Sequence, residues 1–221
     1  MTTVLFAHGL ESGPHGRKVR LLTEAGFTVV ADRMPCGTPA VLQDPVVLVA
    51  AAATAAAVIA VARLGGALWL SLAVIVAVVT APIARAALAR RVLRRSVAVQ
   101  RRALARHRVD VVVGSSFGGA VALELVRSGA WTGPTVLLCP AHCLVAHRAR
   151  QVPPSLRALP PEQAAHVVVV HGRADAIVPI AHSQELVAGT AARLVVVDDD
   201  HRLTATATAD NLAGWIALAR D

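Results

Sequence analysis

Short runs of apolar residues alternate with segments of helical spacing near the start of the chain. Thr3–Ala7 and Phe27–Ala31 are apolar runs of strand length. Between them, Arg17–Ala25 places apolar residues at helical intervals and ends at Gly26. This pattern predicts a strand, a helix and a second strand, with a polar, glycine-rich loop after the first strand.

The same alternation returns from residue 109 to the end of the chain. The predicted strands are Val109–Val113, Thr135–Cys139, His166–Val170 and Arg193–Val197, and the predicted helices are Gly118–Ser128, Ile180–Ala188 and Asp210–Arg220. Residues 141–163 form a proline-containing connection. Because the strands are continuous, valine-rich runs, we expect a mostly parallel sheet with helices on both faces. Residues 1–44 and 109–221 are therefore predicted to form one α/β domain.

Residues 45–84 differ from both parts because they are almost free of charge. Pro45–Ala62 and Leu64–Ala84 contain no charged side chain. A bilayer core of about 30 Å needs roughly 20 apolar residues in a helix. The two segments, joined by Arg63-Leu64-Gly65-Gly66, predict a transmembrane helical hairpin with two spans. A soluble lid of two buried helices is the alternative, since the first segment is rich in alanine.

The net charge of +8 comes from one segment, residues 85–108. This segment carries nine arginines and no acidic residue, and we expect it to form a helix that returns to the α/β domain. Positive charge beside a membrane segment marks the cytoplasmic side, so the α/β domain is expected there. Arg85–Arg108 can bind anionic lipid headgroups or only form a solvated helix face. The interspersed apolar side chains are expected to face a protein core; they are Val92, Val97, Val99 and Leu104.

The sharpest motif is Gly114-Ser115-Ser116-Phe117-Gly118, which follows a predicted strand and opens a predicted helix. This is the context of a G-x-S-x-G nucleophile elbow, in which small residues leave room for a tight turn. Ser116 holds the central position. Its oxygen would lie beside a helix N-terminus, where free N–H groups favour negative charge.

A serine nucleophile needs a base, and the base needs an orienting acid. Asp175 and His201 follow later predicted strands, so both are expected at the sheet edge that carries Ser116. Asp198, Asp199 and Asp200 compete with Asp175 for the role of orienting acid, but neighbours of His201 on an extended segment point to opposite faces.

An acyl-transfer site also needs N–H donors for the oxyanion. The N–H groups of Phe117 and of Leu10 are the candidates, because Leu10 lies in the loop after the first strand. His8, Gly9 and His142 are candidates for lining the substrate pocket.

In these motifs the chain resembles the α/β-hydrolase superfamily, in a small bacterial esterase-like form. The resemblance covers residues 3–44 and 109–221 and implies a minimal α/β-hydrolase fold in which the hairpin is an insertion. It also implies cleavage of an ester or thioester of a small acyl or lipid-like substrate through Ser116, His201 and Asp175. An acyltransferase or perhydrolase with the same triad and a non-catalytic, membrane-associated interaction protein are the alternatives.

Other features bound the function further. Cys36, Cys139 and Cys143 fit no metal or redox spacing, so no cofactor and no metal are expected. Aromatic residues are 3% of the chain, and the basic charge is confined to one segment, so no nucleic-acid partner is expected. Arginine makes up all but one of the 22 basic residues, which is typical of a bacterial, GC-rich genome.

Overall fold

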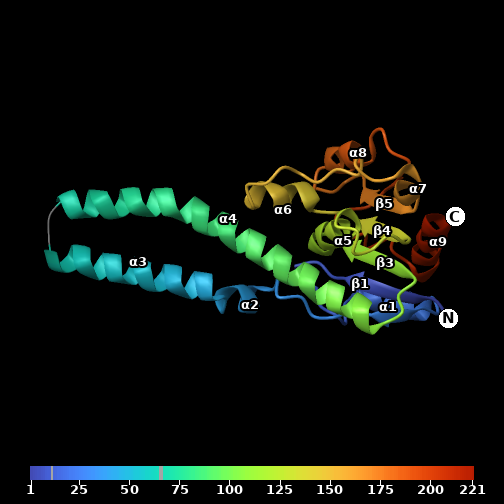
Figure 1. Cartoon of the computed structure of the whole chain (residues 1–221), viewed down its shortest axis with the longest axis horizontal. Coiled ribbons are helices and arrows are strands. Elements are labelled where there is room, and N and C mark those ends of the chain that lie inside the picture. The colour runs from blue at the N-terminus through green and yellow to red at the C-terminus, as the bar shows by residue number, and fades with distance from the viewer. Residues whose placement is uncertain (11, 65–66) are drawn as a thin grey trace.

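A computed structural model describes residues 1–10, 12–64 and 67–221. Its centre is a six-stranded parallel sheet with strand order β2-β1-β3-β4-β5-β6 (Figure 1). The strands are β1 (Thr3–Ala7), β2 (Thr28–Val30), β3 (Val111–Ser115), β4 (Thr135–Leu138), β5 (Val167–Gly172) and β6 (Arg193–Val197). All carboxyl ends therefore lie at one edge, as the sequence predicts for a parallel sheet.

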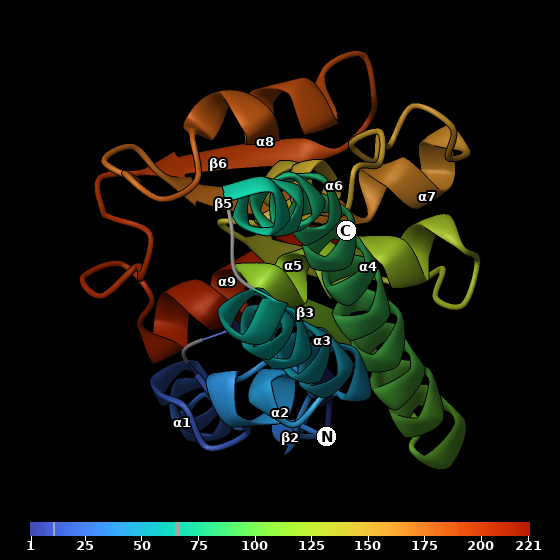
Figure 2. The same ribbon diagram turned by 90° about the vertical axis from the view of Figure 1, so that its left-hand side faces the viewer.

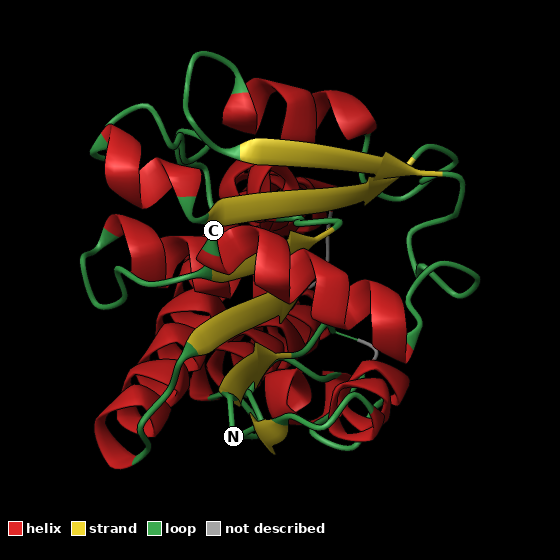
Figure 3. Cartoon of the chain, turned by 90° about the vertical axis from the view of Figure 1, so that its right-hand side faces the viewer, coloured by secondary structure: helices red, strands yellow, loops and turns green. Residues whose placement is uncertain are grey.

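Helices cover both faces of this sheet (Figure 3). One face packs against α1 (Arg17–Glu24) and α9 (Ala209–Arg220), through alternate strand residues such as Val4 and Val113. The other face packs against α5 (Phe117–Arg127), α8 (Ile180–Val187) and the second half of α4 (Ala67–Arg106), through residues such as Leu5 and Val112. This alternation explains the valine-rich strands, because every strand position faces a layer of helices.

The predicted elements are confirmed to within a few residues, and three short helices were missed. These are α2 (Thr38–Leu42), α6 (His142–Arg148) and α7 (Pro161–Ala165). α6 lies within residues 141–163, which were predicted to be a connection, and α7 begins there and extends to Ala165. All three are at most seven residues long, too short for hydrophobic periodicity to define them.

The two apolar segments form α3 (Pro45–Leu64) and the first half of α4, which lie side by side and project away from the sheet (Figures 1 and 2). We call this pair the hairpin. Gly65 and Gly66 of the predicted connection lie outside the described residues. The large apolar side chains along both helices include Val49, Val58 and Val78, and they are exposed. The described side chains thus do not form the soluble lid of two buried helices.

The hairpin and the arginine-rich segment are not separate units, because α4 runs without a break from Ala67 to Arg106. Pro82 lies inside this helix, and a proline there removes one backbone hydrogen bond and permits a bend. The prediction that the arginine-rich segment also faces a core is confirmed at Val92 and Val97, which are buried.

One helix in the described part of the chain, Trp69–Arg106, contains a stretch long and apolar enough to cross a membrane, and Pro45–Val61 is a shorter apolar helix. Length and composition therefore identify one candidate span, whereas the sequence analysis predicted two.

Asp44 fixes the base of the hairpin. Its Oδ1 accepts a hydrogen bond of 3.0 Å from the N–H of Val46 and caps the start of α3. Its Oδ2 lies 2.9 Å from Arg91 Nε and 3.0 Å from Arg95 Nη1 on α4. The N–H of Val46 contributes most to lowering the pKa of the Asp44 carboxyl, and Arg91 and Arg95 lower it further, so that together they outweigh burial, which acts to raise it. The carboxylate thus joins the two helices where they leave the domain.

Candidate active site

Ser116 lies between β3 and α5 in a strained backbone conformation, with φ 55° and ψ −115°. Its N–H donates to the carbonyl of Leu138, 2.9 Å away. The glycines on either side make this turn feasible. A Cβ at Gly114 would lie 2.5 Å from the carbonyl oxygen of Gly118, and a Cβ at Gly118 would lie 1.9 Å from that of Ala7. The G-x-S-x-G spacing is therefore a packing requirement of this elbow.

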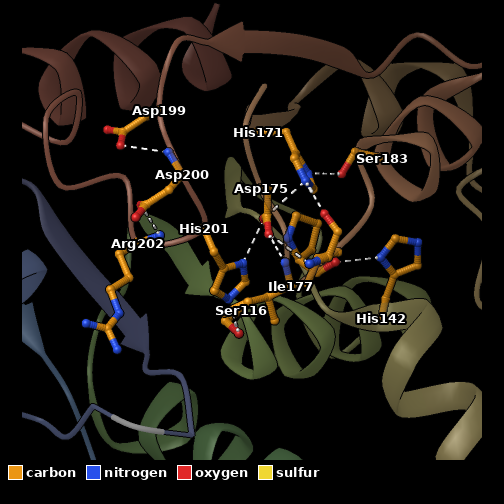
Figure 4. A network of polar contacts seen from close by, with 12 residues as sticks. Ser116, His142, His171, Asp175, Ile177, Ser183, Asp199, Asp200, His201 and Arg202 are labelled. Atoms are coloured by element: carbon orange, nitrogen blue, oxygen red, sulfur yellow. Dashed lines mark hydrogen bonds and ion pairs between the residues drawn. The ribbon is translucent and has the colours of Figure 1, made fainter.

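Ser116, His201 and Asp175 form one hydrogen-bonded chain (Figure 4). His201 Nε2 lies 2.9 Å from Ser116 Oγ, and His201 Nδ1 lies 2.7 Å from Asp175 Oδ2. The Asp175 side chain is fully buried and that of His201 is 11% exposed. With Nδ1–H donating to the carboxylate, Nε2 is free to accept the serine proton. The structure thus brings together the three residues that the sequence placed at separate strand ends.

The other carboxylate oxygen of Asp175 is held by the backbone. Oδ1 accepts hydrogen bonds from the N–H groups of Ile177, at 2.9 Å, and Val178, at 2.8 Å. Burial acts to raise the pKa of Asp175, but the hydrogen bonds from Val178, His201 and Ile177 outweigh it, and the net pKa is lowered. Asp175 is therefore ionised at neutral pH and fixed in orientation.

His171 is a second histidine beside Asp175, and it was not among the site residues predicted from the sequence. Its Nε2–H points to the carbonyl of Val178 at 2.9 Å and lies 3.3 Å from Asp175 Oδ2. Its Nδ1 accepts from the Ser183 hydroxyl at 2.7 Å. Burial lowers the pKa of His171, so the ring is neutral. Its position directly after the predicted strand His166–Val170 was the available sequence signal, but only the fold shows that it lies in β5, against the acid.

The three aspartates before His201 do not compete with Asp175. Asp198 pairs with Arg173 at the surface. Asp199 closes the loop that carries His201, because its carboxylate accepts hydrogen bonds from the N–H groups of Ala205 and Thr206 and from the Thr206 hydroxyl. Asp200 Oδ1 accepts from the N–H of Arg202. The aspartates therefore shape this loop.

Lys18, the only lysine in the chain, also contacts the His201 loop. Its ammonium donates to the carbonyl oxygen of Arg202 at 2.7 Å. Burial lowers its pKa. A single lysine among 22 basic residues was a sequence signal for this position, but no role was predicted for it.

The loop after β1 lies directly against the nucleophile. A Cβ at Gly9 would lie 3.4 Å from Ser116 Cβ, so glycine allows this close approach. The N–H groups of Leu10 and Phe117 have no hydrogen-bond partner among the described residues. His8 is buried and holds the loop, since Nδ1–H donates to the Gly9 carbonyl at 2.8 Å and Nε2 accepts from the Met34 N–H at 3.1 Å.

The chain leaves for the hairpin from this same edge of the sheet. Met34 and Cys36, in the connection from β2 to the hairpin, pack in one buried cluster with Phe117 and with Val92 of α4. This cluster links the start of the hairpin to the helix that follows Ser116.

His142 lines two cavities, one of about 490 Å³ and one of about 150 Å³. It follows Ala141, whose N–H donates to the Ser116 carbonyl. Burial lowers the pKa of His142 to about 4, so it is neutral. None of the three triad residues lines either cavity. His142 therefore follows a residue bonded to the elbow but borders cavities that exclude the triad.

Cys139, His171 and Asp175 bring three potential metal-binding atoms within 4.8 Å of one another. Burial is the main cause that raises the pKa of Cys139 to about 12, so the thiol keeps its proton at neutral pH. Both ring nitrogens of His171 and both oxygens of Asp175 already make hydrogen bonds. This cluster therefore supports the acid of the triad and is a poor cation site.

No protein-family model matches the chain. No curated protein matches it either. Solved structures do match. A protein from Xanthomonas campestris pv. campestris, classed as a hydrolase of the alpha/beta superfamily, is 23% identical with a TM-score of 0.52, over 99% of this chain and 96% of that one.

Two further structures are similar over almost the whole chain. A protein from Agrobacterium vitis, described as a hydrolase, is 15% identical, with a TM-score of 0.53 over 100% of this chain and 88% of that one. A monoacylglycerol lipase from Paleococcus ferrophilus is 14% identical, with a TM-score of 0.50 over 98% and 93%. At these identities the likeness shows the fold, and the chain has the fold of the α/β hydrolases.

Proposed function

We propose that the protein is a serine hydrolase that cleaves an ester or thioester through a Ser116-His201-Asp175 triad. The observation that carries this proposal is the hydrogen-bonded chain from Ser116 Oγ through His201 to Asp175, at a strained elbow. A serine hydroxyl is a weak nucleophile unless a positioned base removes its proton, and His201 Nε2 is 2.9 Å away.

The reaction proceeds in two halves. Ser116 Oγ attacks the acyl carbon while His201 takes its proton, and Asp175 stabilises the imidazolium that forms. His201 then protonates the leaving alcohol or thiol, which leaves an acyl-serine. In the second half His201 activates a water, which attacks the acyl carbon and releases the acid and free Ser116.

The oxyanion of each tetrahedral intermediate is bound by the N–H groups of Phe117 and Leu10. Both groups lack other partners in the described part of the chain. Phe117 also begins α5, so the partial positive charge of this helix N-terminus adds to the site. Losing one such donor costs about 3–4 kcal/mol of transition-state stabilisation.

We further propose that the hairpin anchors the protein in a membrane, with the hydrolase domain on the cytoplasmic side. The support is the series of exposed apolar side chains along α3 and α4, because soluble monomers rarely expose large contiguous apolar patches. The arginines that follow on α4 favour the cytoplasmic leaflet. A lipid-like ester could then reach Ser116 from that leaflet.

The triad is tested by labelling the detergent-solubilised protein with a fluorophosphonate probe, which reacts with activated serines. We expect labelling of the wild type, its loss in Ser116→Ala and its retention in Ser115→Ala, the matched control one residue earlier. A folded wild type that is not labelled overturns the hydrolase proposal and favours a non-catalytic interaction protein. If the acyl group passes to an added alcohol in preference to water, the enzyme is an acyltransferase.

Membrane anchoring is tested separately by alkaline carbonate extraction of cell membranes. We expect the wild type to stay in the pellet and the double variant Val76→Glu/Val79→Glu to be released, since charged side chains are costly in the bilayer core. Val152→Glu is the control, because Val152 is 89% exposed and lies outside the hairpin. Extraction of the wild type itself contradicts anchoring.

A further inference from the structure

The larger cavity lies between α4, α5 and α6, where these three helices pack against one another (Figure 1). Its volume of about 490 Å³ falls within the range of small-molecule pockets. It is lined by none of the triad residues, so the hydrolase mechanism described above does not use it. It therefore has no role in the proposed reaction.

One face of α4 gives this cavity a charged rim. Arg90, Arg94 and Arg101 all line it. Arg94 and Arg101 have no ion-pair or hydrogen-bond partner in the described part of the chain, whereas Arg91 and Arg95 on the same helix are neutralised by Asp44. The single acid in the lining, Glu124, is paired with Arg127 at 3.2 Å. The cavity therefore carries uncompensated positive charge.

The same cavity has an apolar interior. Leu93, Val97 and Ala98 contribute from α4, between the arginines, and Val145 and Ala146 contribute from α6. An apolar lining with a few convergent polar groups is typical of sites for amphiphilic small molecules. Arginine recognises carboxylate and phosphate through paired hydrogen bonds, so the charged part of the ligand is expected to be one of these anions.

The position of the cavity on α4 indicates where such a molecule comes from. Arg90 is five residues beyond Arg85, which is about 8 Å along a helix. The cavity therefore begins just beyond the exposed apolar part of α4. With the hairpin anchored as proposed above, on which this step rests, its near end lies beside the headgroups of the cytoplasmic leaflet. A lipid with two chains would have to leave the bilayer almost entirely to reach it, but a single-chain amphiphile exchanges readily.

We propose that this cavity is a binding site for a single-chain anionic amphiphile, with its carboxylate or phosphate on Arg94 and Arg101 and its alkyl chain along Leu93, Val97 and Val145. A fatty acid and a lysophosphatidate share this chemistry. The site is separate from Ser116 and does not depend on the triad being active.

The test uses the full chain in phosphatidylcholine nanodiscs and three probes with one dodecyl chain that carries a diazirine. The probes differ only in the head, which is a carboxylate, a phosphate or a neutral hydroxyl. We expect light-induced crosslinks from the two anionic probes to residues 93–98 and 145–152, and none there from the alcohol. Stronger crosslinking by the carboxylate probe identifies the ligand as a fatty acid, and stronger crosslinking by the phosphate probe identifies it as a phosphate lipid.

Charge-matched variants give the decisive comparison. Arg94→Gln/Arg101→Gln is expected to lose crosslinking about tenfold or more, since each hydrogen bond to a charged group contributes on the order of one decade of affinity. Arg85→Gln/Arg102→Gln removes the same charge from the same helix outside the cavity and is expected to crosslink like the wild type. Circular dichroism shows whether each variant is folded.

Three outcomes overturn the proposal. They are equal crosslinking by the alcohol, equal loss in the Arg85/Arg102 control, and displacement of the probes by millimolar inorganic phosphate alone, which would make it a simple anion site. Ser116→Ala is expected to crosslink like the wild type. A failure of the hydrolase proposal, seen as absent fluorophosphonate labelling, is thereby distinguished from a failure of this one.

Discussion

Replacing Asp175 with asparagine tests the proposed mechanism at its most constrained atom. Oδ1 of Asp175 accepts from two backbone N–H groups, those of Ile177 and Val178. An asparagine must place its only acceptor oxygen there, because an amide NH2 in that position would face two donors. Its NH2 group then occupies the Oδ2 position, 2.7 Å from His201 Nδ1.

The consequence is the wrong tautomer of the base. The NH2 donates to Nδ1, so the ring proton of His201 moves to Nε2, which can then no longer accept the proton of Ser116. The neutral amide also gives no charge stabilisation to the imidazolium. Asp→Asn in a Ser-His-Asp triad lowers kcat about 10⁴-fold, and four decades correspond to about 5 kcal/mol.

The assay is the rate of fluorophosphonate labelling, together with hydrolysis of p-nitrophenyl butanoate by the detergent-solubilised protein. Asp198→Asn is the control, because it removes the same charge from the loop of His201 at an exposed ion pair with Arg173. A folded Asp175→Asn variant within tenfold of wild-type activity would refute the role of Asp175. An equal loss of activity in Asp198→Asn would show that the charge of the loop, and not the tautomer of His201, causes the effect.

Three further predictions concern packing and positioning. Gly118→Ala is expected to abolish labelling and lower the Tm, because its Cβ would lie 1.9 Å from the Ala7 carbonyl oxygen. Gly214→Ala, inside α9 with no atom nearby, should leave labelling unchanged and should not lower the Tm. Lys18→Met is expected to lower kcat about tenfold by releasing the loop of the catalytic base, with Lys18→Arg restoring part of it; unchanged kinetics contradict this. The pKa of Asp44 is lower in the folded protein, so its carboxylate stabilises the fold at pH values above its ordinary pKa, and this stability is lost as the pH falls through the lowered pKa. The Tm is therefore expected to decline less on acid titration in Asp44→Asn than in the wild type.

The nucleophile elbow and the sheet could be predicted because their signals are local. Gly114 and Gly118 flank Ser116 at a fixed spacing, and each strand is a short valine-rich run next to a turn. The strand limits were less accurate. β3 is paired with β4 as far as Ser115, two residues beyond the predicted end at Val113, because pairing with a neighbouring strand defines its end.

The residues that hold the site in place could not be predicted, because their partners are distant in sequence. Lys18 contacts a carbonyl 184 positions away, and Met34 contacts His8 across 26 positions. Asp199 was read as a competitor for the acid role, since its position two residues before His201 was visible and its hydrogen bonds to residues 205 and 206 were not. These contacts depend on loop closure, which hydrophobic periodicity does not describe.

The hairpin is best understood as an extension of the helix that connects β2 to β3. The strand order β2-β1-β3 requires this connection to cross β1, and the second half of α4 does so with Val92 and Val97 in the core. Because α4 is one continuous helix, the direction of its apolar half is linked to the sheet, which a flexible linker would not achieve. A rise of about 1.5 Å per residue puts Val92 about 10 Å from Arg85 along the helix. Since Val92 packs in the cluster that contains Phe117, the length of α4 sets the distance between the nucleophile and the apolar segment.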